Sequence, residues 1–490
     1  MRLCGRLGSG PSVCGHLTRH LVLEIEMQGT DVTPARIDPP AQPLRLIQLL
    51  RTVVRNPLES WPSAVYQEHL HRSRVLGRDA IFVMHPALIR QVLVDEADSF
   101  DKGEMARRAL EPALGDAILT SDGARWRWQR RAAAPIFRQE HLRGFLPSMI
   151  AAAERTRDRW LSLPAGIEID VAREMMQTTF DIVLETMLSG RSNIDTAAME
   201  RAIADYLEST SWMMALAMIG APRWVPYPGI GKARRGREHL KQLVDGLIAD
   251  VQHRPAARND LLSLLIETTD PETGRSMSDM DIRGNILTFI MAGHETTALA
   301  LTWTFYLLSL HSDVEERVKS EIASVTAGSS LQLEHIDSLQ YTKQVTQEAM
   351  RLYPPAPLIA REARRDVRIG TEAVRPGTVV YVPVYAVHRH AELWDRPDVF
   401  DPTRFEPDAV KARDRYAYLP FGAGLRVCIG MSFAQMETTA VLAVLLESLR
   451  LRLRPGYVPE PKLRVTLRPA GGMPMRLVRP ATGAAVRTVG

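Results

Sequence analysis

The residues with the clearest potential for chemistry lie in the segment FGAGLRVCIG, residues 421–430. Cys428 can bind a metal as a thiolate, and the glycines around it let backbone amides and a flat cofactor approach the sulfur closely. Arg426 offers a fixed fork of donors to an anionic group. A cysteine that only fills a core needs none of these neighbours, so the segment predicts a cofactor site.

Polar residues also interrupt the most apolar stretch of the chain, residues 287–310. Its length would suit a transmembrane helix, but polar side chains at its centre would be costly in lipid, so we expect a long helix through a protein core. The sequence HETT within it begins like the zinc motif HExxH, but Ala298 stands where the second histidine is needed. Glu295 and Thr296 remain as groups that can transfer a proton. Alternatively, the Thr296 hydroxyl has no role in proton transfer and only donates a hydrogen bond to a carbonyl of its own helix.

Two weaker patterns place arginines on predicted helices. In EAMR, Glu348 and Arg351 are three residues apart and can pair on one helix face. In WRWQRR, Trp126 and Arg130 are four residues apart and share a face. Neither pattern is specific by itself, because many helices carry such pairs at their surface.

In their order along the chain, from about residue 35 to about residue 478, the four motifs resemble those of the cytochrome P450 family. Residues 421–430 are similar to its haem-binding loop F-x-x-G-x-R-x-C-x-G, and residues 292–297 are similar to its helix I motif. The resemblance implies the P450 fold, which is mainly α-helical with a smaller β-rich region. It places the haem between the long helix I and the cysteine-bearing loop. It also implies that Cys428 is the axial ligand of the iron in haem b.

The resemblance implies roles for the other residues of the motifs. Thr296 and Glu295 would be catalytic and help to deliver protons to dioxygen. Glu348 and Arg351, completed by Arg404 of a P-x-R-F segment, would be structural. The residues implied to bind the haem are Trp126, Arg130, Ala292, Gly293, Arg361, Phe421, Gly424, Arg426, Cys428 and Gly430.

The activity that the resemblance implies is that of a monooxygenase. It would insert one oxygen atom of O2 into a lipophilic small molecule such as a terpenoid, steroid, fatty acid or aromatic. The sequence has no glycine pattern for flavin or nicotinamide, so we expect a separate ferredoxin or flavodoxin, with its reductase, to supply electrons. Two alternatives stay open: a P450-like peroxygenase or isomerase, and a non-catalytic haem protein that binds a ligand or senses a gas.

Surfaces for the substrate and for the electron donor follow from the same motifs. Residues 205–220 are rich in tryptophan and methionine and are interpreted as an adaptable lid or as core. Basic residues that can attract an acidic donor are Arg127, Arg131, Arg364 and Arg365. The positions expected to line an apolar substrate pocket are Phe289, Ala292, Leu358, Ile359 and the region of Met473.

The composition agrees with a globular enzyme, since 45% of the 490 residues are hydrophobic and 24% are charged. A formal net charge of +4 gives no global support to a nucleic-acid-binding protein. The chain has only three cysteines, which argues against a disulfide framework and for a reducing, cytoplasmic compartment. We expect a poorly ordered extension over residues 1–34, a single domain over 35–490, no integral membrane segment, and a monomer.

Apolar periodicity gives the secondary structure around these motifs. It predicts helices over 141–162, 172–189, 197–219 and 234–252, and the run AIFVM at 80–84 predicts a strand. The amphipathic stretch LRLIQLLRTVV is expected to pack on its own domain, with contact to a membrane surface as the alternative.

Overall fold

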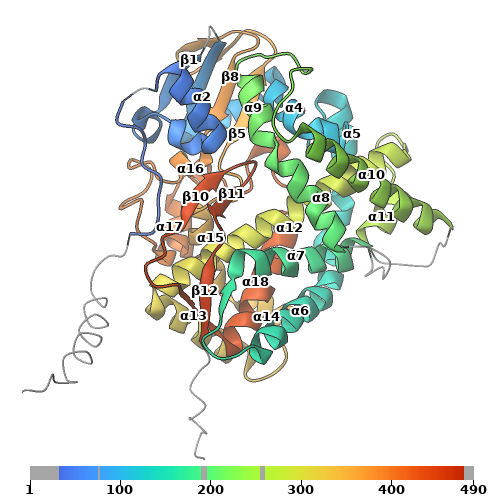
Figure 1. The fold of residues 1–490 in the computed structure, drawn as a ribbon, viewed down its shortest axis with the longest axis vertical. Helices are drawn as coiled ribbons and strands as arrows, with labels where there is room; N and C mark the ends of the chain where they lie inside the picture. The colour runs from blue at the N-terminus through green and yellow to red at the C-terminus, as the bar shows by residue number, and fades with distance from the viewer. Residues whose placement is uncertain (1–32, 43, 76–77, 189–195, 254–259, 479–490) are drawn as a thin grey trace, which may run out of the picture.

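In the computed structural model of the protein, helices surround one long central helix (Figure 1). The structure describes residues 33–478, except for residues 43, 76–77, 189–195 and 254–259. Almost all of the extension predicted over residues 1–34 lies outside this range, so its disorder stays a prediction.

The central helix is α12, Asp279–Leu310. A capping box sets its beginning, because the Ser278 hydroxyl accepts from the Asp281 amide and the Asp281 carboxylate accepts from the Ser278 amide. Most side chains along α12 are buried, which confirms the predicted helix through a protein core. Among the helices that the structure describes, none has the length and apolar character that a bilayer span requires. The helices packed around α12 include α7 (Val171–Leu188), α10 (Ile230–His253), α15 (Gln340–Leu352) and α18 (Met431–Ser448).

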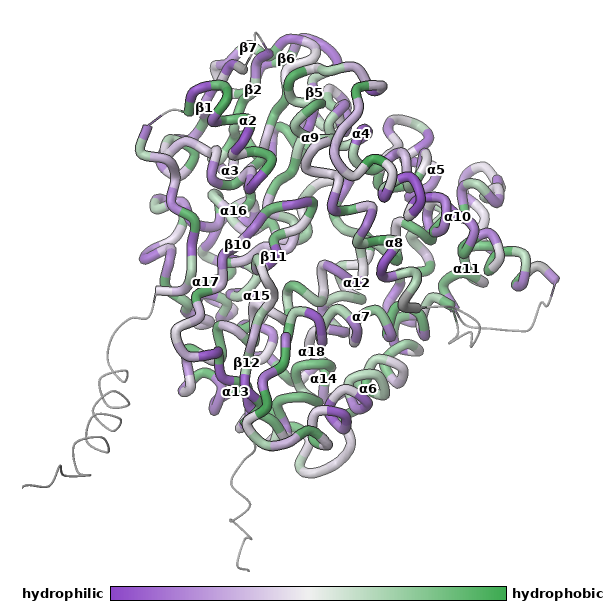
Figure 2. The backbone as a smooth tube through the Cα atoms, viewed as in Figure 1, coloured by the Kyte–Doolittle hydropathy of each residue, from purple (hydrophilic) through white to green (hydrophobic). Residues whose placement is uncertain are grey.

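Three of the four periodic segments form single helices: α6 (Gln139–Ser162), α7 and α10. The prediction of one helix over 197–219 is wrong, because α8 (Thr196–Glu208) and α9 (Thr210–Met218) separate at Ser209. The Ser209 hydroxyl donates to the Tyr206 carbonyl at 2.9 Å, and such side-chain bonds compete with the helical ladder. In Figure 2, polar and apolar residues alternate along α6 and α10, as expected for helices with one face in the core.

The other helices are short or peripheral. They are α2 (Leu46–Arg55), α3 (Pro86–Arg90), α4 (Gly103–Leu114), α5 (Gly123–Ala133), α11 (Leu261–Glu267), α13 (Ser312–Thr326), α14 (Leu333–Ser338), α16 (Val384–Val387) and α17 (Pro407–Ala412). α2 is the amphipathic stretch found in the sequence, and it packs on α9, which confirms the expected contact with its own domain. Leu46 and Ile47 remain exposed at its beginning.

The largest sheet lies at one end of the molecule, beside α2 (Figure 1), and its strand order is β1-β2-β8-β5-β3. Its strands are β1 (Leu70–Val75), β2 (Arg78–Val83), β3 (Phe100–Asp101), β5 (Ile359–Ala363) and β8 (Val379–Val382). β2 confirms the strand predicted at 80–84. Smaller sheets pair β6 (Val367–Ile369) with β7 (Glu372–Val374), β10 (Glu460–Leu463) with β11 (Leu467–Ala470), and β12 (Pro474–Val478) with β4 (Glu168–Asp170) and β9 (Arg450–Leu453). The fold is therefore mainly α-helical with a smaller β-rich region.

A buried ion pair on α15 fixes the segment that leads to the cysteine-bearing loop. Arg351 donates to both carboxylate oxygens of Glu348 at 2.7 Å, and neither side chain is exposed. The Arg351 guanidinium also donates to the carbonyls of His388, Pro397 and Val399 at 2.6–2.9 Å. Arg404 lies 3.6 Å from Glu348, so the triad predicted from the sequence forms. The His388 ring in turn accepts the amide of Leu419 at 2.7 Å, which connects this network to the loop.

Candidate active site

A cavity of about 1370 Å³ lies between α12 and the loop that carries Cys428. Its lining includes Ala292, Gly293 and Thr296 from α12, and residues 419–423 and 426–430 from the loop. Gly424, predicted to bind the cofactor, does not line it. Small-molecule sites typically measure about 300–1,000 Å³, so this volume accommodates a cofactor together with a second molecule. The structure thus brings the two most specific motifs of the sequence to one cavity.

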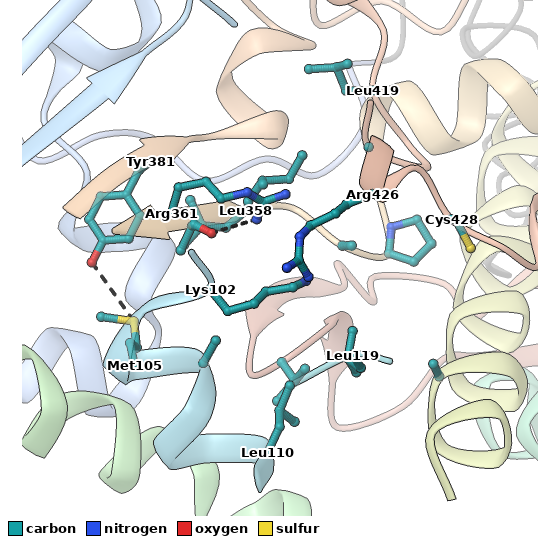
Figure 3. A pocket seen from close by; sticks show the side chains of 18 of the residues that line it. Lys102, Met105, Leu110, Leu119, Leu358, Arg361, Tyr381, Leu419, Arg426 and Cys428 are labelled. Carbon is teal, nitrogen blue, oxygen red and sulfur yellow. Dashed lines mark hydrogen bonds between the residues drawn. The ribbon is translucent and has the colours of Figure 1, made fainter. Parts of the chain in front are cut away.

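The thiol of Cys428 faces this cavity. The residue is surrounded by protein, and its exposed surface opens into the cavity, beside α12 in Figure 3. Its amide donates to the Phe421 carbonyl at 2.9 Å, which closes the loop. Burial raises the pKa of the Cys428 thiol, while the Gly430 amide and the Arg130 guanidinium lower it. A bound metal cation would favour the thiolate further, since the thiolate is the ligand.

Two glycines of the loop adopt backbone conformations that other residues rarely adopt. Gly422 and Gly424 have φ of +71° and +70°. A Cβ on Gly424 would lie 2.1 Å from the carbonyl oxygen of Leu93, so the loop packs directly against the π-helical turn Gln91–Asp95. Gly430 has an ordinary φ of −89°. Its backbone amide lies near the Cys428 sulfur and lowers the pKa of the thiol.

Three separate elements bring cationic side chains to the cavity. α5 contributes Arg130 and the neutral ring of Trp126, β5 contributes Arg361, and the loop contributes Arg426. The Arg426 guanidinium stacks on the Trp126 ring, 4.3 Å from its centroid. Burial, with the neighbouring Arg426 as a further cause, lowers the pKa of Arg361 to about 10. This concentration of partly buried positive charge suits a ligand with carboxylate groups.

Lys102 also belongs to this cationic group, and the sequence motifs did not reveal it. It stands directly before α4 and lines the cavity close to Arg361 and Arg426 (Figure 3). Burial, with the two arginines as further causes, lowers the pKa of Lys102 to about 7. The Asp122 carboxylate is the counter-ion within the group, since it accepts from Arg426 at 2.6 Å and from the Lys102 amide at 3.2 Å.

On α12, Glu295 and Thr296 make different contacts. Thr296 lines the cavity, and its hydroxyl donates to the Ala292 carbonyl at 2.7 Å, the alternative partner recognised in the sequence. Ala292 is exposed in the middle of an otherwise buried helix because it faces the cavity. Glu295 is 3% exposed and accepts hydrogen bonds from Thr466 and from Arg468 at the β10–β11 hairpin. Since the Arg468 side chain is 34% exposed, this ion pair connects the buried acid with the surface.

Of the positions predicted to line the substrate pocket, Phe289, Ala292, Leu358 and Ile359 line the cavity and Met473 does not. A Cβ on Gly293 would meet Val183 and Met187 at ordinary distances of 3.6 and 3.8 Å, so α12 packs closely on α7 there. Met473 is fully buried in the core, and the prediction that it lines the pocket is wrong, because the β10–β11 hairpin supplies residues 463–465 instead. Apolar residues that do line the cavity include Phe289, Ala292, Leu358, Ile359, Met214, Ala217 and Met218.

These residues fit a flat iron cofactor that carries acidic groups. A cavity-facing sulfur with a nearby amide can ligate the iron. Partly buried cations from α5, β5, the loop and the residue before α4 match carboxylates. On the side of the cavity formed by α12, the small side chain of Ala292 leaves space for the cofactor.

Comparison with known proteins agrees with this reading of the site. The family model described as cytochrome P450 matches residues 39–474. The chain is similar to cyclooctat-9-en-7-ol 5-monooxygenase of Streptomyces melanosporofaciens, with 33% identity over 87% of this chain and 94% of the relative. It is also similar to pentalenene oxygenase of Streptomyces avermitilis, with 32% identity over 82% of this chain and 88% of the relative. The crystal structure of the cytochrome P450DA heme domain has a TM-score of 0.77 and 25% identity, covering 92% of this chain and 99% of that one.

Proposed function

The chain belongs to the cytochrome P450 family, and from this premise we propose that its cavity holds haem b on Cys428 with a terpenoid-like lipophilic substrate beside it. As a P450 monooxygenase it uses a haem, O2 and a redox partner. The observation that carries the proposal is that the Cys428 sulfur opens into the same cavity as Ala292 and Thr296 of α12.

The bound haem would supply the reductive activation of dioxygen and the transfer of one oxygen atom to the substrate. Cys428 would hold the iron as a thiolate, and the nearby Gly430 amide would moderate the charge on its sulfur. Arg130, Arg361 and Arg426, together with Lys102, would bind the carboxylates of the haem. We propose haem b, and this cationic group suits its two propionates.

Proton supply falls to α12. The Thr296 hydroxyl lines the cavity and can donate to an oxygen ligand when it exchanges its bond to the Ala292 carbonyl. Glu295 lies next to it in the chain and is held by Thr466 and by Arg468, whose side chain reaches solvent. Protons would pass from the surface to Thr296 along this side of the helix. The apolar lining, with Phe289 and Leu358, orients the substrate and excludes water.

The substrate class rests on the relatives and on the apolar lining. The names of two relatives specify cyclooctat-9-en-7-ol and pentalenene, which are terpenoids. The electron donor is proposed to be a separate ferredoxin or flavodoxin with its reductase. A cytoplasmic location and a monomeric state stay predictions.

A reduced carbon-monoxide difference spectrum tests the proposal, recorded for the purified protein and for Cys428→Ser. We expect the red-shifted Soret band of a thiolate-ligated haem in the wild type and its loss in the variant, because a serine oxygen donates far less electron density. A folded, haem-loaded wild type without this band would overturn the assignment of Cys428.

A further inference from the structure

The β10–β11 hairpin connects the cavity with the buried acid of α12. Residues 463–465, at the turn of the hairpin, line the cavity. Thr466 follows directly, and its hydroxyl donates to the Glu295 carboxylate, as does the guanidinium of Arg468. One short segment therefore contacts both the space for a substrate and the acid assigned to the proton supply.

The carboxyl group of Glu295 is held by this hairpin and not by the cavity wall. Ala292 and Thr296 of the same helix line the cavity, whereas the lining does not include Glu295, which is 3% exposed. Both donors from the hairpin reach the same oxygen of Glu295, Oε1. Charge-assisted bonds of this kind stabilise a buried carboxylate, and the loss of a partner leaves its charge uncompensated. The place of the carboxyl group thus depends on Thr466 and Arg468.

The residue between these two donors is fixed by its backbone. The Leu467 carbonyl accepts from the Trp303 indole of α12 at 3.0 Å, and the Leu467 amide donates to the Pro355 carbonyl at 3.0 Å. Leu467 and Trp303 are fully buried, and Pro355 lines the cavity. The path of the hairpin backbone therefore places both donors against Glu295.

Arg464 connects the turn of the hairpin with two helices that line the cavity. Its guanidinium donates to the Val54 carbonyl at the end of α2 at 2.9 Å and to the Ser211 hydroxyl of α9 at 2.7 Å. These helices supply apolar lining through Leu49, Val53, Met214 and Met218. A molecule that contacts α2 or α9 therefore also acts on the hairpin.

Building on the proposed function, we propose that Thr466 and Arg468 are positioning residues for Glu295, and that the hairpin makes the proton supply depend on what occupies the cavity. A substrate against Val465, or between α2 and α9, would steady the turn of the hairpin. The turn in turn would steady the two donors, so the proton supply would be most effective in an occupied cavity.

The fate of dioxygen reports on this positioning. Dioxygen takes up two electrons and two protons to give hydrogen peroxide, and four of each to give two molecules of water. When protons reach the bound dioxygen poorly, the oxygen–oxygen bond stays intact and more of the electrons leave as peroxide. The share of electrons recovered as peroxide therefore measures how well Glu295 is placed.

Reduction of dioxygen by the haem-loaded protein with a reduced ferredoxin tests the positioning role. We expect Arg468→Gln to slow dioxygen consumption by about tenfold, a part of the roughly 10²–10⁴-fold that a positioned proton donor contributes. The peroxide share and the solvent isotope effect on the rate should both rise, because proton transfer becomes slower. Thr466→Val should act in the same direction, and Arg468→Lys should restore part of the wild-type behaviour.

Arg454→Gln is the matched control for these variants. Arg454 also pairs with a glutamate, Glu168, at 2.8 Å, and neither residue lines the cavity. Thermal unfolding of each variant shows separately whether the fold is kept. If Arg468→Gln and Arg454→Gln gave the same peroxide share and isotope effect, the positioning role would be overturned.

Hydrogen exchange with and without econazole tests the dependence on occupancy. Econazole is a bulky azole whose imidazole nitrogen binds haem iron, so it fills the cavity whatever the substrate is. We expect several-fold slower exchange at the amides of Arg464 and Leu467, which donate to backbone carbonyls at 3.0 Å. Val465→Ala should weaken this protection, and the β6–β7 pair, which does not line the cavity, is the reference. Unchanged exchange over residues 463–468 would overturn the dependence.

Failure of the proposed function is recognised separately, as a missing thiolate-type carbon-monoxide band in the haem-loaded wild type. With that band present, a negative result for the hairpin variants would refute the role of the hairpin alone.

Discussion

On α18, Glu437 carries a carboxyl group that the proposed chemistry does not use. The residue is fully buried, and neither of its carboxyl oxygens has a hydrogen-bond partner among the described residues. Burial raises the pKa of Glu437 to about 8. The folded protein therefore keeps this group neutral at pH 7, while the unfolded chain ionises it at its ordinary pKa near 4.3.

Glu437→Gln should stabilise the protein in a defined pH window. As pH rises from about 4.3 to about 8, the unfolded chain releases the proton and the folded protein retains it, so the free energy of unfolding of the wild type falls. The loss amounts to roughly 1.4 kcal/mol per pH unit and stops growing above about pH 8. Glutamine stays neutral throughout, so we expect a higher Tm than the wild type at pH 7.5 and little difference at pH 4.5.

Thermal unfolding of both proteins at several pH values measures this effect. Glu447→Gln is the control, since it alters an exposed carboxylate on the same helix. Identical pH dependences of the wild type and Glu437→Gln would mean that Glu437 is ionised in the folded protein.

At the scale of elements, the cysteine-bearing loop depends on its contact with the π-helical turn Gln91–Asp95. Gly424 combines a φ of +70° with a Cβ position only 2.1 Å from the Leu93 carbonyl oxygen. Gly123 has a similar φ of +58°, but a Cβ there would meet nothing within 4 Å. The two glycines therefore separate the cost of the backbone conformation from the cost of the contact.

Gly424→Ala should destabilise the protein strongly and impair haem binding, because the loop has to move away from the turn. Gly123→Ala should cost only about 1–2 kcal/mol, the penalty for a side chain in the left-handed region. Thermal unfolding and the Soret absorbance per protein chain measure the two effects. Equal losses in both variants would show that the close approach to Leu93 is unimportant.

The same comparison of elements shows what the sequence could predict. The loop and the α12 motif were recognisable because their chemical groups are neighbours in the chain, and α12 was visible as an apolar run. Lys102 and Arg468 join the site only through folding. Lys102 directly precedes α4, and Arg468 lies at the β10–β11 hairpin. A single lysine or arginine in such segments has no spacing that distinguishes it from a solvated surface residue.

Breaks within helices were equally hard to predict. The stretch 197–219 is periodic throughout, so the pattern suggested one helix. At the interruption, the Ser209 hydroxyl donates to the Tyr206 carbonyl. Whether a serine hydroxyl bonds to a nearby backbone carbonyl depends on its tertiary surroundings, and the local sequence does not specify these surroundings.

For the molecule as a whole, the surface over the cysteine-bearing loop is where an electron donor would approach. Leu425 of the loop is 59% exposed and Val94 of the π-helical turn is 36% exposed. Three of the four arginines predicted to attract a donor already pair with the protein's own carboxylates: Arg127 with Asp98, Arg131 with Asp270 and Glu272, and Arg365 with Glu96. Arg364 is exposed, its amide donates to the Ser99 carbonyl, and no described carboxylate pairs with it.

Arg364 is therefore the arginine of this set whose charge is most available to an acidic partner. Arg364→Glu should raise the KM for a reduced acidic ferredoxin several-fold at low ionic strength, since it replaces attraction by repulsion at the rim of the contact. The difference should shrink in 0.5 M salt, where the Debye length is only a few ångströms. Arg476→Glu, an exposed site on β12, is the control for net charge. If both variants raise KM equally, the donor senses the net charge of the molecule and not this surface.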